Sequence, residues 1–283
     1  MQRNEVIDTV ANCLVRAGST FSEDKKQAYR YAIQSETDST AKWLLETVLK
    51  NAEAAEKNKS PLCDDTGIPH VLIEAGKFRS VSGDFLDAVQ QGIAEGLRRL
   101  PGRPMAVKGE GEDRLGQVLG MYDDPSMVQC APITIRKTAD DVLRVHVLLL
   151  GGGPAIRGRS YRVFHRHDAK NVEQAITEWA IEACAQLGCT PCTLAVGIGR
   201  SHYEAANLML QAQIDGLHIS QTSMEKRITS AVNASMVGPM GMGGNTTVLS
   251  TFIEIGPARA SGVRIVCLRP CCCFEPRHAF AEF

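Results

Sequence analysis

Residues 61–67 of the chain read Pro-Leu-Cys-Asp-Asp-Thr-Gly, and the rest of the chain can be interpreted outward from this stretch. Proline, aspartate and glycine favour turns, so the stretch is predicted to be a loop between two regular elements. A structural cysteine normally lies within an apolar helix or strand. Cys63 instead lies beside two carboxylates, where a thiolate could bind a metal and an acid could transfer a proton.

Apolar periodicity predicts helices before this loop and a mixture of strands and helices after it. The predicted helices cover residues 6–14, 21–33, 40–55, 82–97, 172–187, a segment from about 201, and 221–233. The predicted strands cover residues 70–74, 143–150, 193–198, 246–255 and 263–267. This order of elements predicts an α+β fold, with α/β as the alternative: a helical N-terminal part followed by mixed strands and helices.

One catalytic domain over residues 1–283 is expected, and it could have two lobes. Residues 101–130 are rich in glycine, proline and charge, which predicts a long functional loop between those lobes. The net charge of −1 does not favour nucleic acid or an anionic membrane as a partner. No apolar run approaches the roughly 20 residues of a membrane span. The N-terminus lacks the apolar stretch of a signal peptide, so a cytoplasmic protein is predicted.

Ten cysteines are many for a protein of a reducing compartment, where disulfides are rare. They are therefore core residues, nucleophiles or metal ligands. Cys189 and Cys192 form a C-x-x-C pair, but no second pair follows at zinc-finger spacing, so structural zinc is not expected. Cys63, Cys189 and Cys267 each adjoin a loop or strand edge, and spacing alone does not distinguish them from core cysteines. Four others are interpreted as core residues: Cys13, Cys130, Cys184 and Cys192.

Several motifs, in order, resemble one enzyme family. Residues 63–67 are similar to the Cys-Gln-Asp-Thr-Gly motif of the class I, iron–sulfur-dependent fumarate hydratases and of the tartrate dehydratase α subunits. Residues 238–247 read Gly-Pro-Met-Gly-Met-Gly-Gly-Asn-Thr-Thr and match that family's Gly-Pro-x-Gly-x-Gly-Gly-x-Thr-Thr. Weaker similarities are a glycine triplet at 151–153, a Cys-Thr-Pro at 189–191 and a Gly-Ile-Gly at 197–199. The resemblance spans about residues 5–270.

The resemblance implies a 4Fe–4S cluster held by three thiolates, with one iron left open as a Lewis acid. Cys63, Cys189 and Cys267 would be the ligands. One of the three adjacent cysteines at 271–273 could take the place of Cys267, although only Cys267 has the family's setting at the end of a strand. The implied reaction is reversible dehydration of a small hydroxy-dicarboxylate of the malate/fumarate or tartrate class.

The resemblance also implies roles for residues around the cluster. Asp65 would transfer a proton or orient the substrate hydroxyl; the alternative is a turn aspartate that binds its own backbone. Arg103 would bind a carboxylate bidentately, or be a solvated loop charge. Gly152 and Gly153 would present backbone N–H groups to a carboxylate, or form a plain turn.

The chain departs from the family pattern at three places. Asp64 replaces glutamine, Gly256 replaces the histidine of His-Pro-Ala-Ser, and Leu208-Met209-Leu210 stands where a lysine is usual. These departures motivate an alternative function as a non-catalytic or diverged paralogue that serves as a binding or assembly subunit. A third option is a nucleophilic Cys63. In the family a separate β part completes the site, and the chain ends about where that part would begin. A β-type partner is therefore expected, as an α2β2 assembly.

Overall fold

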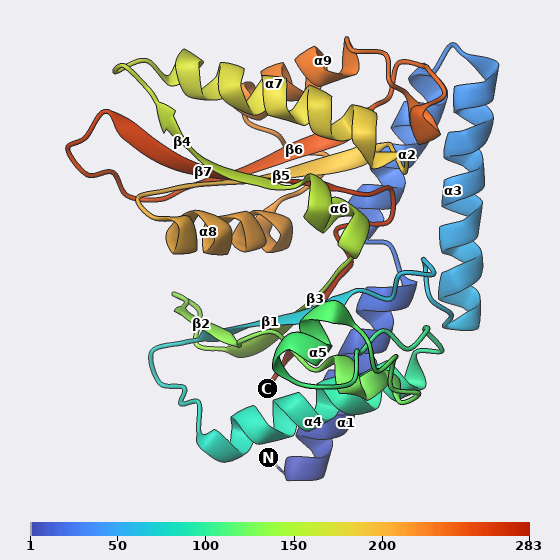
Figure 1. Ribbon diagram of the computed structural model, residues 1–283, viewed down its shortest axis with the longest axis vertical. Helices are drawn as coiled ribbons and strands as arrows, with labels where there is room; N and C mark the ends of the chain where they lie inside the picture. The colour runs from blue at the N-terminus through green and yellow to red at the C-terminus, as the bar shows by residue number, and fades with distance from the viewer. Residues whose placement is uncertain (1) are drawn as a thin grey trace. The chain divides into compact units, whose positions relative to one another are not determined.

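The computed structural model describes residues 2–283 and divides the chain into two compact units. The first unit contains the chain up to Thr20, Ala52–Gly151 and Arg277–Phe283. The second contains Phe21–Asn51 and Gly152–Pro276. Each unit combines helices with a mixed sheet, which confirms the predicted α+β class (Figure 1). The loop region at 101–130 lies wholly within the first unit, so the division does not follow it.

The first unit is a four-stranded sheet of order β2-β1-β3-β8 with helices packed on one face. Its strands are β1 (Ile68–Ala75), β2 (Thr134–Lys137), β3 (Leu143–Leu150) and β8 (His278–Glu282). Its helical elements are α1 (Arg3–Ser19), α4 (Gly83–Arg99), α5 (Gly111–Gly116) and the 3-10 turn η1 (Pro125–Val128). β1 pairs parallel to β2 and antiparallel to β3, and β3 pairs antiparallel to β8.

The helix predicted over residues 82–97 is confirmed as α4, with a capped start and a regular apolar face. The Ser82 side chain accepts a hydrogen bond from the backbone N–H of Phe85 at 3.2 Å, which satisfies an amide at the start of the helix. Four buried side chains then follow at four-residue intervals, so that they share one face: Phe85, Val89, Ile93 and Leu97. That face joins the core formed by α1 and the inward-facing residues of β1 and β3, and α1 and α4 lie side by side (Figure 1).

The second unit is a four-stranded sheet of order β4-β7-β5-β6 with helices on both faces. Its strands are β4 (Arg159–Phe164), β5 (Cys192–Gly199), β6 (Val248–Ile255) and β7 (Val263–Cys271). Its helical elements are α2 (Glu23–Ser35), α6 (Gly152–Arg157), α7 (Ala169–Leu187), α8 (His202–Asp215), α9 (Ser223–Asn233) and η2 (Pro239–Gly241). α7 and α9 cover one face and α8 the other (Figure 1). The remaining helix, α3 (Ser39–Asn58), contributes residues to both units.

Every residue of β5 is buried, as the continuous apolar run at 193–198 predicted. β5 pairs parallel to β6 and antiparallel to β7. Three short or half-exposed strands were not predicted, because their apolar pattern is weak: β2, β4 and β8. β7 extends four residues beyond its predicted end at Cys267. Within residues 2–283, no helix combines the length and apolar character that crossing a membrane requires.

A buried carboxylate on the sheet of the first unit gathers basic side chains from the neighbouring strands. Glu74 accepts hydrogen bonds from Arg136 and from Arg144, both at 2.7 Å, and its side chain is 7% exposed. Burial alone would raise the pKa of Glu74, but hydrogen bonds from Arg136 and His146 lower it to about 2. The ionised form of Glu74 therefore stabilises the fold.

Stability is expected to depend on pH through Glu74. A carboxyl whose pKa is lowered by folding adds stability above its unfolded pKa near 4.5, and that stability is lost as pH falls toward 2. Glu74→Gln should cost about 2 kcal/mol at pH 7, because two guanidinium groups lose a charged acceptor. Denaturant unfolding from pH 7 to pH 2 measures both effects.

The matched control is Glu282→Gln, which removes a half-exposed carboxylate that binds Arg144. Its effect should be well below 1 kcal/mol. Equal losses in the two variants, or an unchanged gap between wild type and Glu74→Gln as the pH falls, would contradict the role assigned to Glu74.

Candidate functional site

The loop at 61–67 connects α3 to β1 in the first unit, as predicted. The backbone N–H of Leu62 donates to the carbonyl of Gly18 at 2.9 Å, which fixes the start of the loop on α1. Gly67 closes the loop with φ +84°, and a Cβ there would lie 2.5 Å from an Nη atom of Arg277 and 3.0 Å from the backbone of Leu150. Only glycine satisfies both demands at this position.

Asp65 is held on both its side chain and its backbone. Its Oδ1 accepts from the backbone N–H of Gly67 at 3.1 Å, which is the turn contact considered in the sequence analysis. Its carbonyl accepts from Nη1 of Arg277 at 2.5 Å. Arg277 is 2% exposed and also donates to the carbonyl of Leu149 at 3.1 Å. The buried guanidinium therefore positions the loop at 61–67, called the acid loop below, and this role was not predicted from the sequence.

Asp64 and Arg103 form an ion pair at the surface of the first unit. Nη1 of Arg103 lies 3.0 Å from a carboxylate oxygen of Asp64, and the two side chains are 55% and 80% exposed. The negative charge that replaces the family's glutamine is therefore compensated within the chain. A solvated pair of this kind contributes little to stability, so both groups remain accessible to a ligand.

Cys189, in the segment between α7 and β5, contacts Cys273 within the second unit. The backbone N–H of Cys273 donates to the carbonyl of Cys189 at 2.8 Å. Cys189 is half-exposed, whereas Cys272 and Cys273 are buried. A hydrogen bond with Cys272, followed by burial, raises the pKa of the Cys273 thiol, and Cys189 adds to the shift. A bound metal would reverse this preference, because a coordinating thiol is deprotonated.

Cys267 lies away from Cys189. On β7, Cys267 is opposite Gly197 of β5, whereas Cys271 is opposite Thr193. The four residues from Thr193 to Gly197 rise about 13 Å along the strand, and Cys189 precedes β5 at its other end. The structure thus brings Cys189 together with Cys273 and not with Cys267. The sequence left open whether Cys267 or one of the cysteines at 271–273 would be the third ligand, and β7 continues past Cys267 to Cys271.

The other cysteines predicted to be core residues are buried or half-buried. Cys13, Cys184 and Cys192 are buried as predicted, and Cys130 is half-buried. In the part of the chain that the structure describes, no three Cys, His, Asp or Glu side chains are grouped as ligands of one metal ion. Cys63 belongs to the first unit, and Cys189 and Cys273 to the second. Thiol donors at loop positions fit the chemistry of an iron–sulfur cluster, which selects cysteine thiolates.

The glycine loop packs directly against the residue after Cys189. Oγ1 of Thr190 donates to the carbonyl of Gly238 at 2.5 Å and accepts from the backbone N–H of Gly241 at 3.2 Å. Gly238 has φ +69°, and a Cβ there would lie 1.7 Å from the carbonyl oxygen of Gly243. Two motifs that lie about 50 residues apart in the sequence are therefore in contact, and the glycines of the loop allow close packing.

Gly152 and Gly153 form the first turn of the six-residue helix α6. Gly152 is exposed and Gly153 is half-buried, so backbone N–H groups at this turn can be reached from solvent. Both glycines belong to the second unit, whereas Asp65 and Arg103 belong to the first.

Sequence reasoning missed a buried lysine and tyrosine beside the cysteine triplet. Nζ of Lys25 donates to the carbonyl of Glu275 at 2.7 Å, and the hydroxyl of Tyr29 donates to the carbonyl of Cys273 at 2.8 Å. Burial lowers the pKa of Lys25 to about 8. The available signal was spacing: Lys25 lies four residues after Phe21 and four before Tyr29, on the apolar face of α2.

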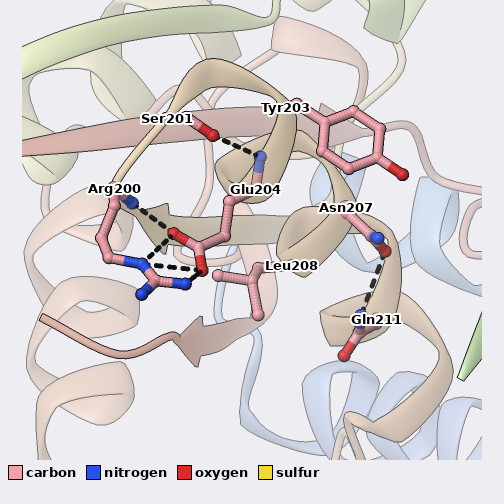
Figure 2. Close-up of a pocket in the computed structure, with 7 residues that line it drawn as sticks. All are labelled: Arg200, Ser201, Tyr203, Glu204, Asn207, Leu208 and Gln211. Carbon is pink, nitrogen blue, oxygen red and sulfur yellow. Dashed lines mark hydrogen bonds and ion pairs between the residues drawn. The ribbon is translucent and has the colours of Figure 1, made fainter.

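A cavity of about 560 Å³ lies along α8, lined by residues of the segment 200–211 (Figure 2). Arg200 donates to the Glu204 carboxylate through both Nε and Nη2, and these hydrogen bonds lower the pKa of Glu204 to about 2. The Asn207 and Gln211 amides are hydrogen-bonded to each other at 3.0 Å. The predicted site residues are not among the side chains that line this cavity.

Comparison with known proteins identifies the family. A family model described as fumarate hydratase (fumerase) matches residues 7–282. A putative L(+)-tartrate dehydratase subunit alpha of Methanocaldococcus jannaschii is 24% identical over 286 residues, covering 97% of this chain and 96% of that protein. The L(+)-tartrate dehydratase subunit alpha of Escherichia coli strain K12 is 25% identical over 273 residues, covering 95% and 88%. Because the family model spans nearly the whole chain, the protein belongs to the fumarate hydratase (fumerase) family of hydro-lyases.

Proposed function

We propose that this chain is the α-type subunit of an iron–sulfur hydro-lyase that reversibly dehydrates a small hydroxy-dicarboxylate of the malate/fumarate or tartrate class. The observation that carries the proposal is the meeting of Cys189 with Cys273 beside the glycine loop, in a chain of the fumarate hydratase family. Cytoplasmic location follows as part of the proposal, since ten free thiols are best preserved in a reducing compartment.

The proposed cofactor is a 4Fe–4S cluster bound by Cys63, Cys189 and Cys273. Cys273 replaces Cys267 in this assignment because of its hydrogen-bonded contact with Cys189. When bound, a cluster with three protein ligands supplies a Lewis-acidic iron that polarises a carboxylate and a hydroxyl group.

The protein residues bind and orient the substrate. Arg103 presents a guanidinium that matches a carboxylate bidentately, once the carboxylate displaces or shares the contact with Asp64. The amides of Gly152 and Gly153 offer donors to a second carboxylate. Asp65 is the proposed group for proton transfer or for orienting the substrate hydroxyl, and Arg277 holds its loop in place through the Asp65 carbonyl.

A β-type subunit is the proposed partner, in an α2β2 assembly. The support is that the two relatives are named as α subunits and that the chain covers 88–96% of their length. The deciding experiment is anaerobic co-expression with a β-type subunit, followed by iron and sulfide analysis and assay of a panel of hydroxy-dicarboxylates. Dehydration should require both subunits.

Two results would contradict this proposal in different ways. Turnover of malate or tartrate by the purified single chain would remove the need for a β subunit. The lack of any cluster, with or without the partner, would favour a diverged binding or assembly subunit, which the replacements at Asp64 and Gly256 had suggested.

The assignment of Cys273 predicts a sharp contrast between two serine variants. Cys273→Ser should lose the cluster, measured as bound iron and sulfide and as the visible absorption of the anaerobic protein, together with at least 100-fold of turnover. Cys267→Ser is the matched control. Cys267 is a half-buried thiol on β7, and it lies far from Cys189. The reverse pattern would return the ligand role to Cys267.

The ion pair of Arg103 with Asp64 predicts a change in substrate affinity. Asp64→Gln restores the family's residue and releases the guanidinium, so KM for a dicarboxylate should fall about fivefold, equivalent to about 1 kcal/mol. The effect should shrink at high salt, because the pair is exposed. Asp87→Asn, which removes an exposed carboxylate from α4, controls for net charge. An unchanged or higher KM in Asp64→Gln would show that Asp64 does not compete for Arg103.

A further inference from the structure

Helix α2 places a lysine in the apolar interior of the second unit, next to the segment that carries Cys273. Lys25 is 1% exposed, and its Nζ lies 4.3 Å from the centroid of the Phe21 ring. The rings of Phe21, Tyr29 and Phe274 pack together around it. Burial of an ammonium group in such surroundings is unfavourable unless a compensating interaction is present.

The compensation available from carboxylates at this turn is already used. Glu275 is fully buried, and its carboxylate binds the buried guanidinium of Arg269 at 3.1 Å. Within residues 2–283, the Lys25 ammonium donates to the Glu275 carbonyl oxygen, at 2.7 Å, and not to a carboxylate. Of the side chains Lys25, Arg269 and Glu275, two are therefore cations and one is an anion. Among these three side chains the surplus is one positive charge, and the nearby Asp24 carboxylate is engaged by the backbone N–H of His218.

We propose that the Lys25 ammonium is a buried counter-charge for the cluster and raises its reduction potential. This inference rests on the proposed function, in which Cys273 is a ligand. A cluster held by three thiolates is anionic, and reduction by one electron adds a further negative charge. A nearby cation in a poorly polarisable interior stabilises the reduced form more than the oxidised form.

The same charge protects the cluster. Oxidation by molecular oxygen removes an electron from the cluster and makes it more positive, which a neighbouring ammonium disfavours. Lys25 is thus a tuning residue and not a catalytic one, because its contacts are to protein carbonyl and ring atoms.

The effect of the Lys25 charge must be distinguished from the effect of the hydrogen bonds that α2 donates to this segment. Tyr29 donates to the carbonyl of Cys273 at 2.8 Å and is neutral, so it holds the ligand segment without an ionic contribution. Tyr29→Phe removes this hydrogen bond alone. Lys25→Met removes both donor and charge, whereas Lys25→Gln keeps an N–H donor without the charge. Lys25→Arg keeps the charge, and Lys42→Met removes an exposed lysine from α3 as a surface control.

The test uses the anaerobic αβ complex, loaded with iron and sulfide and titrated with dithionite at pH 7 while the reduced cluster is followed by EPR. Circular dichroism and iron content establish that each variant is folded and loaded. Lys25→Met and Lys25→Gln should lower the midpoint potential by at least a tenfold change in the reduction equilibrium, about 59 mV for one electron. Lys25→Arg, Tyr29→Phe and Lys42→Met should stay close to wild type.

The outcomes separate the inference from the proposed function. Two results overturn the inference alone when the wild type carries a cluster. One is a midpoint potential that is unchanged in both Lys25→Met and Lys25→Gln. The other is a potential shift in Tyr29→Phe as large as that in the neutral Lys25 variants. If Lys25→Gln folds without taking up a cluster while Lys25→Arg is loaded, the need for the charge is supported; if Lys25→Arg also fails to load, the inference is contradicted. A wild-type complex without any cluster overturns the proposed function, and the inference with it.

Discussion

The fully buried strand β5 is the constraint on which the candidate site of the second unit depends. Its residues are buried on both faces of the sheet, so a shift of register would move every side chain out of the packing that it makes there. Cys189 lies just before its first residue, and the glycine loop precedes β6, its parallel neighbour. β7 runs antiparallel to it and delivers the cysteine triplet to that same end. Three segments distant in the sequence therefore meet because one strand fixes them all.

The first unit uses a different device to order its acid loop. A single buried guanidinium, that of Arg277, binds backbone carbonyls of both Asp65 and Leu149. The side chain of Asp65 accepts a hydrogen bond from the backbone N–H of Gly67 within the same loop. The loop is thereby ordered through contacts to its backbone.

The sequence predicted the parts of this architecture that have strong apolar periodicity or clear turn-forming residues. The central strand β5, the capped helix α4 and the acid loop are of this kind, because apolar runs and turn residues act locally. Which thiol lies near Cys189 was not predictable, since it depends on strand register: β7 runs to Cys271, and its pairing with β5 places Cys271, and not Cys267, at the end of the sheet near Cys189.

Long-range polar contacts were missed for the same reason. Nothing near Lys25 in the sequence indicates that it reaches the carbonyl of Glu275, 250 residues away. The spacing of Lys25 from Phe21 and Tyr29 places it on the apolar face of α2. A single lysine in an apolar pattern does not by itself predict burial. The ion pair of Asp64 with Arg103 likewise depends on how β1 and α4, which lie between the two residues in the sequence, pack in the first unit.

That ion pair has a consequence for how the site would respond to its surroundings. Asp64 is a carboxylate tethered beside a guanidinium that suits carboxylates, so it behaves as an intramolecular competitor at a fixed effective concentration. In the proposed function, a dicarboxylate that binds Arg103 competes with this tethered carboxylate. The apparent affinity for the dicarboxylate would then be lowered by a constant factor, set by the fraction of molecules in which the ion pair is open.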